Sequence, residues 1–124
     1  MLSSHVLDLA LGRPARDLVL RLDVQDADAD ADADAADADR DSGWRTIASA
    51  ITDGDGRVGD LLQGAPLAPR TYRITFETGA YFAAGGRPAF YPRVEVRFAV
   101  TAPDQHHHIP LLLAPFGYST YRGT

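Results

Sequence analysis

Three of the four histidines in this chain of 124 residues are consecutive, His106-His107-His108. Side chains alternate between the two faces of a strand, so His106 and His108 share one face and His107 points to the other. The two imidazoles on the shared face would lie about 7 Å apart at the normal strand rise. His5 lies in another predicted strand and could join them.

A cluster of imidazoles can perform two kinds of chemistry. One imidazole can activate water as a general base near neutral pH. Alternatively, His5, His106 and His108 could bind zinc and lower the pKa of a bound water. Surface histidines without a chemical role are a third interpretation, and the short motif does not separate the three.

An arginine follows a strong turn signal in the middle of the chain. The sequence Asp53-Gly54-Asp55-Gly56 favours a hairpin turn, and Arg57 comes directly after it. A guanidinium there could hold an anionic or urea-like substrate through paired hydrogen bonds, or it could be a solvated side chain beside a turn. The turn also hints at calcium, but no EF-hand ligand register follows it.

Alternation of apolar and polar residues dominates the chain and predicts half-buried antiparallel strands. The apolar run Ile109–Leu113 should anchor the final Tyr121-Arg122-Gly123-Thr124, so that a guanidinium, a hydroxyl and a carboxylate could occupy a defined site. Short strands between regular turns, with one short helix over 79–84, predict a β-sandwich. The predicted strands cover residues 2–9, 18–24, 44–51, 71–76, 94–100, 107–113 and 118–121.

The composition favours one domain over residues 1–124, with a low-complexity Asp/Ala loop insertion at 26–41. This segment contributes −7 to the formal net charge of −5, which leaves +2 on the rest of the chain. Self-repelling carboxylates without large apolar residues predict a disordered, solvated spacer, or at most a weak cation binder.

Several function classes are excluded by what the sequence lacks. The chain has no cysteine, so disulfides and thiolate ligands are excluded. The arginines are scattered rather than clustered, which argues against nucleic-acid binding. No apolar run is long enough for a membrane span and the N-terminus has no secretory pattern, so a soluble cytoplasmic protein is expected.

Four dispersed motifs resemble those of the 5-hydroxyisourate hydrolases, the transthyretin-related enzymes of purine catabolism. The motifs are Ser4-His5-Val6-Leu7-Asp8, Asp55-Gly56-Arg57, the segment from His106 to Leu113, and Tyr121-Arg122-Gly123-Thr124. The resemblance covers nearly the whole chain apart from 26–41. It implies a transthyretin-like β-sandwich of two four-stranded sheets with one short helix, and a homotetramer with sites at the dimer–dimer interface.

The resemblance also implies an activity. These enzymes hydrolyse 5-hydroxyisourate, the product of urate oxidase, to 2-oxo-4-hydroxy-4-carboxy-5-ureidoimidazoline without a cofactor or metal. By position, the implied catalytic residues are His5, Arg57 and His108, and the implied substrate-binding residues are His106, Tyr121, Arg122, Gly123 and Thr124. One of His5 and His108 would activate water while the other orients or donates a proton, and Arg57 would stabilise the developing oxyanion.

Two departures from the family pattern stand out. Thr124 replaces the usual terminal serine but keeps a hydroxyl and the carboxylate, and His107 replaces a usual tyrosine on the side expected to face the core. A transthyretin-type carrier of iodinated hormones is an alternative, but that branch lacks the histidines, the arginine and the ending that this chain retains. A zinc hydrolase built on the three histidines and a non-catalytic binding module are further alternatives.

Overall fold

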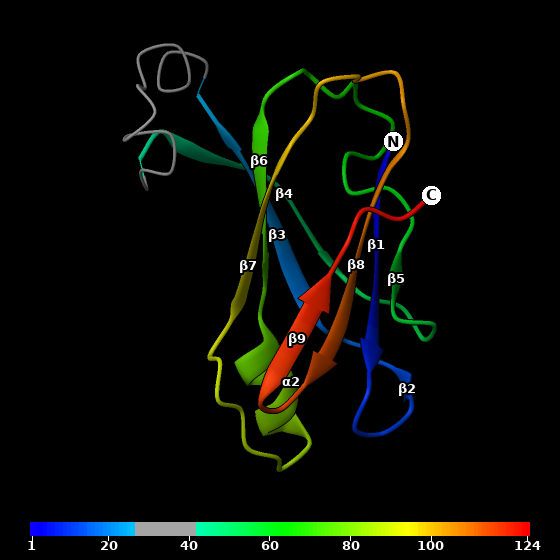
Figure 1. Ribbon diagram of the computed structural model, residues 1–124, viewed down its shortest axis with the longest axis vertical. Helices are drawn as coiled ribbons and strands as arrows, with labels where there is room; N and C mark the ends of the chain where they lie inside the picture. Colours follow the sequence, from blue (N-terminus) through cyan, green and yellow to red (C-terminus); the bar gives the residue numbers. More distant parts are fainter. Residues whose placement is uncertain (27–41) are drawn as a thin grey trace.

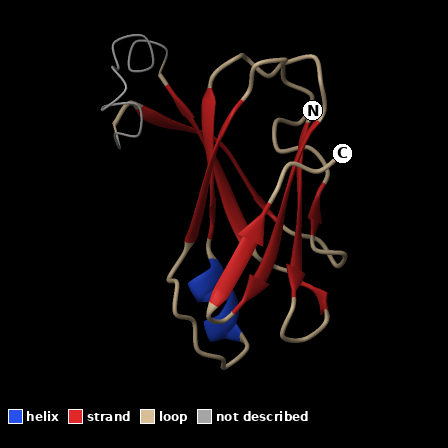
Figure 2. Cartoon of the chain, viewed as in Figure 1, coloured by secondary structure: helices blue, strands red, loops and turns tan. Residues whose placement is uncertain are grey.

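The computed structural model describes residues 1–26 and 42–124. Two β-sheets form the layers of a sandwich, and one short helix lies at one end of it (Figures 1 and 2). The predicted all-β fold with a single short helix in the described residues is therefore confirmed. The predicted Asp/Ala insertion lies outside the described residues except for Asp26, and the single domain over 1–124 stays a prediction.

The first sheet contains five strands: β1 (Leu2–Asp8), β2 (Arg13–Pro14), β5 (Arg57–Val58), β8 (His107–Ala114) and β9 (Gly117–Thr120). Its order is β2-β1-β8-β9, and β5 also pairs with β1. The sheet has five strands rather than the expected four because two strands of two residues each pair with β1. Arg13 and Pro14 form one of them, opposite Asp8 and Leu7.

The second sheet has the order β4-β3-β6-β7 and is antiparallel throughout. Its strands are β3 (Val19–Gln25), β4 (Trp44–Ile51), β6 (Thr71–Phe76) and β7 (Val94–Ala99). Alternate apolar residues of both sheets, among them Leu22, Ile74 and Leu111, are fully buried between the layers. Alternation in the sequence thus predicts the core-facing side of β3, β6 and β8, because one face of such a sheet packs on the core.

Asp23 departs from this pattern, since it lies on the predicted solvent face of β3 but is almost fully buried. Its carboxylate accepts hydrogen bonds from Thr46 Oγ1 at 2.7 Å and Arg73 Nη2 at 2.9 Å, and Arg21 lies within ion-pair distance. Burial alone would raise the pKa of Asp23, but these hydrogen bonds and the two arginine charges hold it below its ordinary value. The long side chains of Arg21 and Arg73 on the outer face therefore cover Asp23.

The helix α2 (Thr78–Ala84) directly follows β6 and begins one residue earlier than predicted. No helix among the described residues is long and apolar enough to cross a membrane. The expected cytoplasmic location stays a prediction.

Candidate active site

A pocket of about 250 Å³ lies where β1, β5, the start of β8 and the C-terminal residue meet. The side chains of chemical interest in its lining are Ser3, Arg57, His106, His108 and Thr124. The N-terminal strand, β5 and the C-terminus lie on the same side of the molecule, at the right of the view in Figure 1. Four segments that are distant in the sequence therefore build one site.

Strand pairing explains how these segments meet. β1 runs parallel to β8 with Ser3 opposite His108, and β5 pairs antiparallel with β1 so that Arg57 lies opposite His5. Directly paired residues point to the same face of a sheet. Ser3, His5, Arg57 and His108 consequently share the outer face of the first sheet. The neighbouring His107 points inward and is buried, as the alternation predicts.

The hydroxyl of Ser3 joins the two histidines of the pocket. Ser3 Oγ lies 2.8 Å from His106 Nε2 and 2.7 Å from His108 Nδ1, while the ring centroids are 6.3 Å apart. Ser3 is only 7% exposed. The sequence predictions did not include Ser3, although its position two residues before His5 in a strand was a signal that it shares the histidine face.

The electrostatic surroundings favour a neutral His108. Burial lowers the pKa of the His108 imidazole below its ordinary value, and the positive charge of Arg57 and the neighbouring imidazoles His106 and His5 lower it further. Because Nδ1 is engaged by Ser3, Nε2 is the ring nitrogen left for a substrate or a water molecule. His108 therefore has the protonation state that a general base needs at neutral pH.

The turn before β5 positions Arg57. Gly56 has a positive φ of 73°, and an added Cβ there would overlap the carbonyl oxygen of Val6. The same close approach lets the Gly56 carbonyl accept a 2.8 Å hydrogen bond from the Val6 amide. Asp53 Oδ1 accepts from the amides of Asp55 and Arg57 at 2.9 and 3.0 Å. The predicted Asp-Gly turn thus holds the start of β5 against β1.

His5 shares the outer face with His108 but does not line the pocket. Its Nε2–H donates a 2.9 Å hydrogen bond to the carbonyl oxygen of Asp55, in the turn that carries Arg57. His5 therefore holds the Arg57 turn directly. Its interaction with His108 is electrostatic and acts across the outer face of the sheet.

Of the four C-terminal residues that were predicted to bind substrate, Gly123 and Thr124 reach the site, and Tyr121 and Arg122 do not. The Gly123 amide donates a 2.8 Å hydrogen bond to the His108 carbonyl, and an added Cβ on Gly123 would overlap the His108 ring. Thr124 continues into the pocket. Tyr121 and Arg122 instead line a separate pocket of about 330 Å³ beside β7, together with His107. Arg122 Nη2 donates there to Gln105 Oε1 at 3.0 Å.

The three histidines considered as zinc ligands do not converge. No group of three histidine or carboxylate side chains among the described residues is placed to hold a metal ion. The facing nitrogens of His106 and His108 both lie at hydrogen-bond distance from the Ser3 hydroxyl, and His5 is directed at Asp55. The donor arrangement fits a hydrogen-bonded hydroxyl better than a metal.

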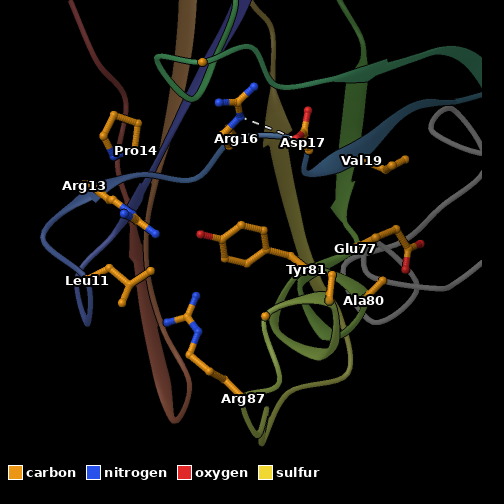
Figure 3. A pocket seen from close by; sticks show the side chains of 13 residues that line it. Leu11, Arg13, Pro14, Arg16, Asp17, Val19, Glu77, Ala80, Tyr81 and Arg87 are labelled. Atoms are coloured by element: carbon orange, nitrogen blue, oxygen red, sulfur yellow. Dashed lines mark ion pairs between the residues drawn. The ribbon is translucent and has the colours of Figure 1, made fainter.

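A larger hollow of about 820 Å³ lies beside helix α2 (Figure 3). Tyr81 and Arg87 enter it from the helix side, with Arg13 and Pro14 opposite. Arg87 Nη2 and the Tyr81 hydroxyl donate to the buried Asp8 carboxylate at 2.6 and 2.7 Å. Arg87, Tyr81 and Asp8 thus satisfy one another's hydrogen-bonding groups, and none of the described residues that line this hollow is a histidine. The pocket of about 250 Å³ that contains His106 and His108 is therefore the candidate site.

Replacing Asp8 with alanine is expected to lower the free energy of unfolding by about 2–4 kcal/mol, because Arg87 and Tyr81 would lose the buried acceptor that they share. Denaturant unfolding monitored by circular dichroism measures the change. The exposed Asp104→Ala variant is the matched control. Equal unfolding midpoints for the two variants would show that the Asp8 cluster does not stabilise the fold.

The comparisons with known proteins agree with this geometry. A family model described as HIUase/Transthyretin family matches residues 2–123. The chain belongs to this family. Within the HIUase/Transthyretin family, a curated relative from Rhizobium meliloti (strain 1021) named 5-hydroxyisourate hydrolase 2 is 42% identical over 128 residues, which cover 99% of this chain and 95% of the relative.

Two solved structures show that the fold similarity extends to both branches of the HIUase/Transthyretin family. The 5-hydroxyisourate hydrolase of Klebsiella pneumoniae is 33% identical with a TM-score of 0.77, and the match covers 99% of this chain and 98% of that one. Sea bream transthyretin, solved in complex with thyroxine, is 31% identical with a TM-score of 0.80 and coverages of 99% and 94%. The fold therefore does not separate the branches.

Proposed function

We propose that this chain hydrolyses 5-hydroxyisourate to 2-oxo-4-hydroxy-4-carboxy-5-ureidoimidazoline. One observation carries the proposal: a neutral imidazole, His108, and a guanidinium, Arg57, line the same pocket. This pair supplies a base for water and a positive charge for the oxyanion of an amide-like hydrolysis. Relatives named 5-hydroxyisourate hydrolase, which align over nearly the whole chain, support this choice of substrate.

The mechanism assigns the base to His108. Nε2 of His108 takes a proton from a water molecule, and the resulting hydroxide attacks the carbonyl carbon of the six-membered ring. The carbonyl oxygen becomes an oxyanion that Arg57 stabilises. The C–N bond then breaks, the ring nitrogen takes the proton from the His108 imidazolium, and the carbonyl carbon becomes a carboxyl group.

The other candidate residues have supporting roles in this proposal. His5 holds the Asp55 carbonyl and thereby keeps Arg57 over the outer face. Gly123 allows the C-terminal backbone to lie against the His108 ring, so that Thr124 closes one side of the pocket. Tyr121 and Arg122 lie outside this pocket in a single chain, so we assign them substrate contact only through an assembled oligomer.

The activity is expected to fall on the acid side of neutrality. Because burial lowers the pKa of His108 below its ordinary value of 6.5, the base stays neutral as the pH falls through 7, and activity is lost only below that ordinary value. The dependence of kcat/KM on pH measures this acid limb. A flat profile from pH 5 to 8, with chemistry limiting the rate, would contradict histidine as the base.

We further infer that the protein is a homotetramer. Strand β9 is one edge of the first sheet and β7 is one edge of the second, and exposed aromatic side chains lie at or near the β9 edge, with Phe90 66% and Phe116 69% exposed. Pairing of strand edges between copies would cover these residues. Light scattering on the protein as it leaves a size-exclusion column should give about four times the chain mass of 13.4 kDa. A mass of one chain would overturn this inference.

The test of the function is product identification. Urate oxidase and labelled urate generate 5-hydroxyisourate in the presence of catalytic amounts of this protein, and carbon NMR follows the ring-opened ureido carboxylate. Faster appearance of that product, with many turnovers per chain, is expected. Unchanged product formation together with stoichiometric thyroxine binding would favour the carrier alternative. Loss of turnover after chelator treatment would favour the zinc alternative.

A further inference from the structure

We infer that Ser3 is a positioning residue whose hydroxyl sets the tautomer of His108 and couples it to the protonation of His106. The kinetic consequence of this inference rests on the proposed function, but the hydrogen-bond arrangement does not. Both contacts are short, 2.8 Å to His106 Nε2 and 2.7 Å to His108 Nδ1, and the Ser3 side chain is nearly buried. A hydroxyl in this place has little competition from solvent.

The single proton of the hydroxyl allows two arrangements. A serine hydroxyl donates one hydrogen bond and accepts others. In the first arrangement, His108 Nδ1–H donates to Ser3, and Ser3 donates to an unprotonated His106 Nε2. In the second, His106 Nε2–H donates to Ser3, and Ser3 donates to His108 Nδ1. Each arrangement satisfies all three groups, but they leave different tautomers on His108.

Only the first arrangement makes His108 a base. With the proton on Nδ1, the Nε2 lone pair is free to accept a proton from water. With the proton on Nε2, the neutral ring can only donate there. The first arrangement also survives the reaction, because an imidazolium still carries the Nδ1–H that donates to Ser3. The hydroxyl therefore keeps a hydrogen bond throughout the proposed cycle without rotating.

The neighbouring charges select the first arrangement near neutral pH. Arg57, on β5, lines the pocket that Nε2 must face, and its positive charge favours a lone pair over an N–H on that nitrogen. The imidazole of His5, on β1, acts on His108 in the same direction when it is charged. Thr124, from the C-terminal segment, also lines this pocket.

Protonation of His106 reverses the chain of hydrogen bonds. A charged His106 carries a proton on Nε2 and can no longer accept from Ser3, which leaves His108 Nδ1 as the other histidine nitrogen in reach of the Ser3 hydroxyl proton. A neutral His108 then places its proton on Nε2 and loses its basic lone pair. A proton on His106 would thus remove the basic lone pair of His108 without adding a proton to His108.

Nitrogen NMR of histidine-labelled protein tests the arrangement without any substrate. Long-range proton–nitrogen correlations distinguish the two tautomers of each ring. In the wild type at neutral pH we expect the Nδ1–H tautomer of His108 and an unprotonated His106 Nε2. In Ser3→Ala we expect a mixture of His108 tautomers. An identical His108 tautomer in both proteins would overturn the inference.

Kinetics of three variants separate positioning from folding. We expect Ser3→Ala to lower kcat about tenfold with KM nearly unchanged, because the base is mispositioned while Arg57 is intact. Ser3→Thr retains a hydroxyl and should recover at least half of the wild-type kcat. Ser49→Ala, an exposed serine of β4 on the other sheet, is the matched control. Equal losses in Ser3→Ala and Ser3→Thr would indicate a packing role and overturn the inference.

Failure of this inference can be distinguished from failure of the proposed function. If the wild type does not hydrolyse 5-hydroxyisourate, the function fails while the tautomer measurement still decides the role of Ser3. If the wild type is active and the Ser3→Ala variant matches it in both kcat and tautomer, the function stands and the positioning role falls. The pH titration adds a second readout: in the wild type, neutral His108 should change from the Nδ1–H to the Nε2–H tautomer when His106 becomes protonated, and in Ser3→Ala it should not.

Discussion

The His108→Asn variant is expected to turn over 5-hydroxyisourate at least tenfold more slowly than the wild type. General bases contribute about 10²–10⁴-fold to a rate, so even the low end of that range exceeds the predicted loss. The amide of asparagine occupies roughly the place of Nδ1 and can keep the hydrogen bond with Ser3. The nitrogen that faces the pocket is lost, so the variant removes the base with little change in packing.

The measurement is kcat from the ultraviolet decay of 5-hydroxyisourate at saturating concentrations, with the enzyme concentration expressed per folded chain. Circular dichroism and thermal unfolding should show that His108→Asn folds like the wild type. Turnover within twofold of the wild type would remove His108 from the role of base and leave His5 as the remaining predicted candidate for that role.

The Arg57→Gln variant is expected to lose about 10²-fold or more in kcat, since removing one donor from an oxyanion site costs about 10²–10³-fold. Arg57 lines the pocket beside His108, and its backbone is held by Asp53 and Gly56 independently of its side chain. The substitution therefore removes the positive charge without loosening the turn. It should also raise the pKa of His108, because that charge is one cause of the lowered value.

Two further variants sharpen this prediction. Arg57→Lys keeps the charge but not the paired donors. If the guanidinium donates two hydrogen bonds to the substrate, the kcat of this variant should lie between those of the wild type and Arg57→Gln. Arg45→Gln, an exposed arginine of β4, is the matched control and should leave kcat unchanged. A kcat for Arg57→Gln equal to that of the control would show that the guanidinium does not stabilise the transition state.

Local patterns in the sequence predicted a large part of the fold. Alternation identified the strands and placed His107 toward the core and His106 with His108 on the other face, because side-chain direction in a strand depends only on position. The Asp-Gly turn before Arg57 was recognisable because few sequences satisfy a positive φ such as that of Gly56. The family resemblance supplied the sandwich architecture.

Long-range register lay beyond these patterns. The parallel pairing that sets Ser3 opposite His108 joins residues 105 positions apart, and no local rule fixes such a pair. The bridging role of Ser3 was therefore missed. The direction of Tyr121 and Arg122 was also not readable, because it depends on how the terminal segment leaves β9. Alternation with Leu22 and Val24 places Asp23 on the solvent side of its strand. Its burial was not predictable, because the Arg73 side chain that covers it comes from a strand distant in sequence.

The most direct test of the central claim is the initial rate of 5-hydroxyisourate decay with chelator-treated protein at neutral pH, measured against the spontaneous decay. The account predicts a large acceleration that survives chelation, because His108 and Arg57 supply the base and the charge without a metal. No acceleration by a folded, tetrameric wild type would contradict the claim that this pocket is a hydrolase site.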